Sequence, residues 1–303
     1  MASSHNYLDP ETLSELKDLT VRASTIVDGL VTGMHRSPFK GYSVEFAQHR
    51  EYAPGDDIRH VDWKVFARTD KLHLKQYEDE TNLCCWFLVD QSQSMQFQGP
   101  EAVWSKYDFA CCLAVAFAWL VLNQRDAVAS ALFADELTSI GKPSDRQESL
   151  TQLIAMLEDS DCPESTSFEK SLGAFAVENS KRGIVVVISD CFDEFESIAA
   201  GLESIRRRDH QVVLIQVVDP TELTLDLDQA MELRGLESGP TTLVDPVSLQ
   251  SDYQKVVEDQ TRLLSGFCEK QSILFEQVTS DTNLSSALTR IITRLSGANV
   301  VKR

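Results

Sequence analysis

The chain has 303 residues, of which 43% are hydrophobic and 25% are charged, and its formal net charge is −19. A chain of this size and composition buries enough surface to fold without disulfides or a structural metal. The acidic balance argues against a nucleic-acid partner, because phosphate binding requires clustered positive charge. No run of about 18 apolar residues indicates a membrane span, and the polar start resembles no signal peptide, so we expect a cytoplasmic protein.

The use of the seven cysteines is consistent with a cytoplasmic location. None has the spacing of zinc ligands, and an odd total argues against a disulfide framework. We expect most of them to be buried as small hydrophobic side chains. Cys191 follows Asp190 directly, and for it too we favour burial over redox or nucleophilic chemistry.

The first predicted element is an amphipathic helix that begins at Asp9-Pro10 and ends at Gly33, with apolar residues at helical spacing between them. Its apolar face packs either on its own chain or on a second copy, and the sequence leaves both open. A polar segment, residues 34–82, follows with a turn at 54–57 and a half-buried strand at 73–77.

Residues 34–75 contain eight Lys and Arg against six Asp and Glu, unlike the acidic remainder of the chain. We favour a structural network of ion pairs over a docking surface for a partner, and we expect Trp63 and Phe66 to pack in the core. The network would pair four arginines with four acids, namely Arg36, Arg50, Arg59 and Arg68 with Glu45, Asp56, Asp57 and Asp62.

From residue 83 onward, apolar strands alternate with helices. Strands are predicted at 83–89, 127–134, 184–189, 211–218 and 273–278, helices at 105–123, 146–158, 168–180, 195–208, 248–270 and 283–295, and a hairpin at 231–244. Buried strands separated by helices indicate a doubly wound α/β fold, a mostly parallel sheet with helices on both faces. We therefore divide the chain into a region 1–82 and a domain 83–303.

Two of the predicted strands end in an aspartate. Asp90 closes the strand 83–89 and is followed by Ser92 and Ser94, and Asp190 closes the strand 184–189. Thr166 precedes a helix in a loop between them. An aspartate after a strand usually turns the chain and a threonine before a helix usually caps it. If the two strands are neighbours where the strand order reverses, however, the two carboxylates converge on one crevice, and the loop with Thr166 could add a hydroxyl.

The ordered set Asp90-x-Ser92-x-Ser94, Thr166 and Asp190 resembles the metal-ion-dependent adhesion site of von Willebrand factor type A domains, and the resemblance covers residues 83–295. It implies a Mg²⁺ site, or one for Mn²⁺ or Ca²⁺. Ser92 and Ser94 would bind the cation directly, Asp90 and Asp190 would balance its charge, and Thr166 would be a ligand whose engagement depends on conformation. Asp193 and Glu194 extend the acidic loop, and we expect both to be solvated surface.

The segment before this domain resembles the bacterial domain-of-unknown-function family number fifty-eight, usually encoded beside MoxR-type AAA+ ATPases. The resemblance rests on a series of short motifs: His35-Arg36-Ser37, 41–47 (GYSVEFA), His49-Arg50-Glu51-Tyr52, 54–59 (PGDDIR), Val61-Asp62-Trp63, Ala67-Arg68-Thr69-Asp70 and Tyr77-Glu78-Asp79-Glu80. Some members carry transmembrane helices; without one, this chain resembles the cytosolic subgroup.

These features favour recognition over catalysis, because we find no histidine or lysine near the motifs that is poised as a general base. The leading hypothesis is a non-enzymatic, Mg²⁺-dependent interaction module that acts with a MoxR-type ATPase. It would serve as adaptor or co-chaperone in the maturation or assembly of another protein complex, and would bind its client through an acidic side chain at the metal. The alternatives are a metal-dependent phosphoester hydrolase and a scaffold with vestigial metal loops.

Overall fold

The structure is a computed structural model. It describes residues 19, 46–51, 63–69, 72–77, 83–100, 102–160, 162–163, 166–179, 182–225, 231–233, 242–244 and 246–300. The chain divides into two compact units, one of Lys40–Asn82 and one of Met1–Phe39 together with Leu83–Arg303. The predicted division at residue 82 differs from this one in that it groups residues 1–39 with the smaller unit.

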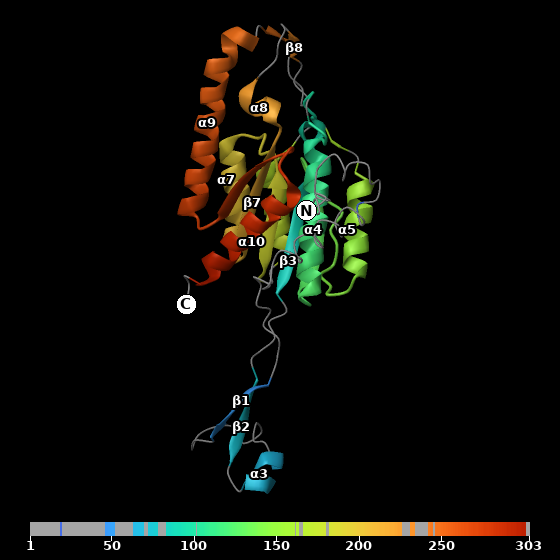
Figure 1. Ribbon diagram of the computed structural model, residues 1–303, viewed down its shortest axis with the longest axis vertical. Coiled ribbons are helices and arrows are strands. Elements are labelled where there is room, and N and C mark those ends of the chain that lie inside the picture. The colour runs from blue at the N-terminus through green and yellow to red at the C-terminus, as the bar shows by residue number, and fades with distance from the viewer. Residues whose placement is uncertain are drawn as a thin grey trace, which may run out of the picture. The chain divides into compact units, whose positions relative to one another are not determined.

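A six-stranded sheet forms the centre of the larger unit (Figure 1). Its strand order is β10-β7-β6-β3-β4-β5, and every neighbouring pair is parallel except the edge pair β4 and β5. The strands are β3 (Cys84–Asp90), β4 (Ala127–Phe133), β5 (Leu137–Thr138), β6 (Ile184–Ser189), β7 (Gln211–Val218) and β10 (Leu274–Thr279). All five strands predicted from apolar runs are present.

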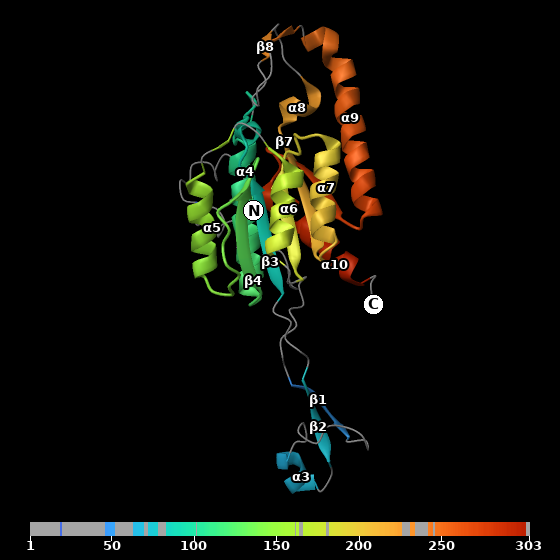
Figure 2. The ribbon, with the colours of Figure 1, turned by 180° about the vertical axis from the view of Figure 1, so that it is seen from behind.

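Helices cover both faces of this sheet. One face carries α4 (Lys106–Asn123), α5 (Glu148–Glu158) and α10 (Leu284–Val300), and the other carries α6 (Phe168–Glu178), α7 (Phe195–Arg206) and α9 (Pro246–Lys270) (Figures 1 and 2). Side chains of β3 alternate between the two cores, with Phe87 and Val89 in one and Trp86 and Leu88 in the other. The predicted doubly wound α/β fold is confirmed.

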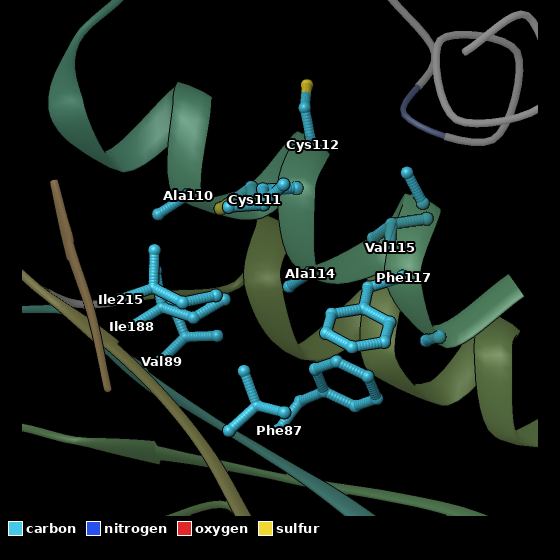
Figure 3. Close-up of a cluster of buried hydrophobic side chains, with 14 of the residues drawn as sticks. Phe87, Val89, Ala110, Cys111, Cys112, Ala114, Val115, Phe117, Ile188 and Ile215 are labelled. Atoms are coloured by element: carbon cyan, nitrogen blue, oxygen red, sulfur yellow. The ribbon is translucent and has the colours of Figure 1, made fainter. Parts of the chain in front are cut away.

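Helix α4 lies in the middle of its face and is buried over most of its circumference. Its Phe117 meets Phe87 of β3 edge-to-face, with ring centroids 5.4 Å apart; Figure 3 shows both side chains in the core between helix and sheet. By length and composition α4 passes the test for a membrane span, which corrects the expectation that no segment reaches that threshold. In this fold, 78% of the helix is buried against the sheet and its neighbours.

The strand order reverses between β3 and β6. The chain leaves β3 through α4 toward β4 on one side, and it leaves β6 through α7 toward β7 on the other. The two strands pair directly, with Val89 opposite Ile188, so their carboxyl ends lie side by side. This is the place where open α/β sheets bind ligands.

Four short elements follow the strands of the sheet in the chain. The 3₁₀ turn η2 (Gln93–Gln96) and the helix α8 (Pro220–Thr224) were not predicted; α8 is only five residues long and depends on a capping box made by Asp219 and Glu222. The predicted hairpin is confirmed as the antiparallel pair β8 (Met231–Leu233) and β9 (Thr242–Val244).

Of the predicted N-terminal helix, only Leu19 is among the described residues. It is helical and buried in the α4 core of its own unit, so at this residue the helix packs on its own chain. The remainder of that helix lies outside the described residues.

The smaller unit contains an antiparallel pair, β1 (Phe46–Glu51) and β2 (His73–Tyr77), and a helix α3 (Trp63–Thr69). The strand predicted at 73–77 is confirmed. The prediction that Trp63 packs in a core is wrong, because this side chain is 61% exposed; its ring contacts that of the half-buried Phe66 edge-to-face. Arg68 is exposed, and most members of the predicted ion-pair network lie outside the described residues, as does the predicted turn at 54–57.

Candidate functional site

The first loop of the candidate site begins at Asp90, the last residue of β3, which is fully buried. Its Oδ1 accepts a 2.9 Å hydrogen bond from the backbone N–H of Ser92, which turns the chain back over the strand end. The hydroxyl oxygens of Ser92 and Ser94 then lie 3.0 Å apart. The Asp-x-Ser-x-Ser spacing thus brings its three side chains into one buried turn.

The third loop begins at Asp190, directly after β6, and this side chain is also buried. Its Oδ1 accepts a 3.0 Å hydrogen bond from the backbone N–H of Phe192. The preceding residue, Ser189, donates a 2.6 Å hydrogen bond to Asp90 Oδ2 and so joins the two strand ends. The two aspartates therefore share one region, as the sequence requires for a common ion.

Burial perturbs the ionisation of Asp90. Desolvation, and next the charge of Asp190, raise the pKa of Asp90 to about 7, although hydrogen bonds from Ser189 and Ser92 act in the opposite direction. Two like charges at one strand edge destabilise each other unless a cation is present. The site is therefore electrostatically suited to a positive charge.

The second loop, which carries Thr166, is tied to both others. The backbone N–H of Gln93 in the first loop donates to the carbonyl of Pro163 (2.8 Å), and the backbone N–H of Phe168 donates to Asp193 Oδ2 in the third loop (3.0 Å). Asp193 also accepts a hydrogen bond from Ser197 Oγ (2.6 Å) and so connects the second and third loops. The prediction that Asp193 is solvated surface is therefore wrong. Glu194 is exposed, as expected.

The Thr166 hydroxyl is an unexplained polar group in the second loop. Its Oγ1 is buried, and within the described part of the chain it has no hydrogen-bond partner. A buried hydroxyl without a partner costs roughly 1–3 kcal/mol. A ligand that this hydroxyl could bind would remove that cost.

The donor set fits a hard dication. Neighbouring oxygen ligands of octahedral Mg²⁺, each at 2.0–2.1 Å, lie about 3 Å apart, and the hydroxyls of Ser92 and Ser94 have that separation. Within the described ranges no group of three or more His, Cys, Asp or Glu side chains could hold a metal, so an ion here depends on the serine and threonine hydroxyls. Asp90, Ser92, Ser94, Thr166 and Asp190 are the side chains that would hold it.

Sequence reasoning missed a lysine at this site. Lys106, the first residue of α4, is fully buried, and its Nζ lies 2.8 Å from Asp190 Oδ2 and 2.6 Å from Glu222 Oε1 of α8. Burial lowers the pKa of Lys106, but the charges of Asp190 and Glu222 outweigh burial and raise it above its ordinary value. The feature of the sequence that could have indicated Lys106 is a cation in the first turn of a predicted helix, where the macrodipole disfavours it.

Aromatic rings flank the same ammonium. Lys106 Nζ lies 5.7 Å from the ring centroid of Phe97 and 5.3 Å from that of Phe192, and Phe192 is 57% exposed. The site thus has an exposed apolar residue beside it, Phe192, which no sequence motif indicated.

The described cysteines behave as small hydrophobic residues. All seven lie within the described residues, none of them forms a disulfide, and all but the partly exposed Cys162 are buried. Burial raises the pKa of the Cys191 thiol well above its usual range, so a reactive thiolate beside Asp190 is disfavoured.

A family model described as "Protein of unknown function DUF58" matches residues 48–262. Uncharacterized proteins of Mycobacterium bovis and Mycobacterium tuberculosis are each 29% identical to the chain over 253 residues, which is 82% of this chain and 78% of theirs.

Solved structures with a similar fold include the conserved hypothetical protein BatB from Bacteroides thetaiotaomicron, at 14% identity and a TM-score of 0.47, covering 72% of this chain and 98% of BatB. An aerotolerance-related membrane protein from Bacteroides fragilis has 14% identity and a TM-score of 0.43, covering 70% of this chain and 99% of that one. The vWF domain of the pilus tip protein Mfa5 from Porphyromonas gingivalis has 11% identity and a TM-score of 0.36, covering 70% and 94%. The cytoplasmic location of the present chain stays a prediction.

Proposed function

Since this chain belongs to the family described as "Protein of unknown function DUF58", a description that names no reaction, we propose a function from its site. We infer that the protein is a non-enzymatic interaction module whose recognition of a partner depends on Mg²⁺. It acts with a MoxR-type AAA+ ATPase as an adaptor or co-chaperone in the maturation or assembly of another protein complex.

The observation that carries this proposal is the buried hydroxyl of Thr166, which has no hydrogen-bond partner among the described residues, in a loop hydrogen-bonded to the Asp90 loop. The three loops that these hydrogen bonds join carry the five proposed donors, which are hydroxyl and carboxylate oxygens, and only two of the five carry charge. A Mg²⁺ held by such ligands retains an electrophilic position that a carboxylate from another protein can occupy. The client would therefore present an acidic side chain.

Surroundings of the site support a protein ligand. Phe192, 57% exposed and two residues after Asp190, offers an apolar contact beside the polar centre. The ATPase partner is proposed from the resemblance of the motifs between His35 and Glu80 to a family usually encoded beside MoxR-type ATPases.

A pull-down with the AAA+ ATPase encoded nearest to this gene tests the proposal. We expect binding in Mg²⁺, and loss of binding both in EDTA and for Asp90→Ala. Glu194→Ala is the matched control, because it removes an exposed carboxylate of the third loop and should leave binding unchanged. Equal capture in all these conditions would remove the metal from the mechanism.

Lys106 favours one competing function, a scaffold whose metal loops are vestigial. Its ammonium already compensates Asp190, so the loops have an internal cation. Calorimetry that detects neither Mg²⁺ nor Mn²⁺ binding would support this scaffold. The phosphoester hydrolase, an alternative of another class, predicts turnover of a phosphoester panel that Asp190→Ala abolishes.

A further inference from the structure

Lys106 occupies a position that is unfavourable for the stability of helix α4. The positive end of the α4 macrodipole faces a lysine in the first turn, and full burial adds a desolvation cost. Asp190 and Glu222, which lie 84 and 116 residues later in the chain, are the groups that compensate these costs. The lysine is therefore part of the strand-edge site.

One of its two partners is also a candidate metal ligand. Asp190 Oδ2 binds Lys106 Nζ at 2.8 Å, whereas its Oδ1 is used by the backbone N–H of Phe192. Each oxygen of this carboxylate thus already has a positively polarised partner. A dication that takes Asp190 as a ligand must displace the ammonium or share the carboxylate with it.

We propose that Lys106 is a built-in cation that competes with the divalent ion for Asp190 and keeps the metal affinity of the free protein low. The carboxylate of a partner adds negative charge that balances the positive charge of Lys106. The metal and the partner therefore bind to the site together. This inference rests on the proposed metal-dependent function and deepens it by assigning its regulation to one lysine.

Glu222 provides the position to which the displaced ammonium can move. Its Oε1 lies 2.6 Å from Lys106 Nζ, and its Oε2 accepts the backbone N–H of Asp219 in the α8 capping box. The lysine keeps this partner when Asp190 engages the metal. Removal of Glu222 should therefore strengthen the hold of Lys106 on Asp190 and weaken metal binding.

The test is calorimetry of the full chain with Mn²⁺ and with Mg²⁺, without a partner. Lys106→Met should bind Mn²⁺ at least about tenfold more tightly than wild type, and Glu222→Gln should bind it more weakly, since Gln keeps the capping geometry. Lys170→Met is the matched control, because Lys170 forms an exposed ion pair with Glu136, and its affinity should change less than about twofold.

The two variants of this ion pair are expected to change the Mn²⁺ affinity in opposite directions. If Lys106→Met folds poorly, the affinity of Glu222→Gln alone still tests the inference. Lys106→Met binding no tighter than wild type, or Glu222→Gln binding no weaker, overturns the inference. If the wild type binds metal and these signs fail, only the role of Lys106 is lost. Absence of binding in every variant overturns the inference together with the metal dependence of the proposed function.

Discussion

Ser189 Oγ donates a 2.6 Å hydrogen bond to Asp90 Oδ2, and through it the end of β6 holds the carboxylate at the end of β3. We expect Ser189→Ala to destabilise the metal-free protein by about 1.5–3 kcal/mol when Asp90 is ionised, the usual range for a hydrogen bond to a charged group. Because the pKa of Asp90 is raised to about 7, the loss should be larger at pH 8 than at pH 6. Urea unfolding in EDTA at both pH values measures it.

Ser171→Ala is the control for this comparison. Ser171 Oγ is buried and donates to the neutral carbonyl of Ala134 at 2.8 Å. Its removal should cost about 1 kcal/mol at either pH. A cost of Ser189→Ala that does not differ between pH 6 and pH 8 would contradict an ionising Asp90 at this hydrogen bond.

The Thr166 hydroxyl gives a prediction that separates a ligand from a structural group. Thr166→Val replaces a hydroxyl that has no partner among the described residues by a methyl group of similar size, so stability in EDTA should stay within about 0.5 kcal/mol of wild type or rise. The stabilisation that saturating Mg²⁺ gives to wild type should decrease, since affinity for the folded state is lost. Thermal unfolding with and without Mg²⁺ measures both effects.

Thr138→Val provides the contrasting case. Thr138 Oγ1 donates to the carbonyl of Leu132 (3.2 Å) and accepts from Gln91 Nε2 (2.9 Å), so its loss should cost about 1 kcal/mol without altering the Mg²⁺ response. If Thr166→Val behaved like Thr138→Val, its hydroxyl would be structural.

Most of the fold of residues 83–300 followed from local patterns. The run from Ile184 to Ser189 is apolar because both faces of β6 are covered, and such a run is readable without a structure. The aspartates at the strand ends were readable for the same reason, since each follows its strand directly. That the two aspartates lie together depends on the pairing of β3 with β6. The order of the elements along the chain allows this pairing but does not determine it.

The missed features depend on tertiary contacts. Lys106 meets Asp190 across 84 residues of sequence, and no local pattern encodes that distance. Asp193 was expected on the surface because it lies in an acidic loop, but the N-terminus of α6 packs beside it and donates a backbone N–H to it. Trp63 was expected in a core from its residue type alone, and residue type does not determine which side of α3 faces solvent.

Gly99 positions the end of the first loop. Its backbone N–H donates to Asp219 Oδ2 (2.9 Å), and a Cβ at this position would clash with Asp219 Oδ1 and Thr221 Oγ1. Gly99→Ala should therefore destabilise the protein by about 1–3 kcal/mol, the usual cost of overpacking.

Gly173→Ala is the control, because a Cβ there meets nothing within 4 Å and Gly173 lies inside α6. It should stabilise by about 0.5–1 kcal/mol, and denaturant unfolding of both would contradict the prediction if the two changes had the same sign.

A pH dependence remote from the metal loops is expected at Asp126, which precedes β4. Burial raises its pKa to about 6, against the smaller opposing effect of the hydrogen bond from the Leu83 backbone N–H. A carboxyl group with a raised pKa in the folded state contributes stability that is complete below its unfolded pKa of about 3.9 and is lost as the pH rises through its folded value. Asp126→Asn should therefore leave stability at pH 4 nearly unchanged and increase it at pH 8 by about 1–2 kcal/mol, because partial contact with solvent moderates the cost of the ionised carboxylate. Asp135→Asn, which removes an exposed charge, should change stability by less than about 0.5 kcal/mol at both pH values. Urea unfolding of wild type and both variants in EDTA decides the matter, and an equal gain for Asp126→Asn at pH 4 and pH 8 would show that ionisation of this buried aspartate is not its cause.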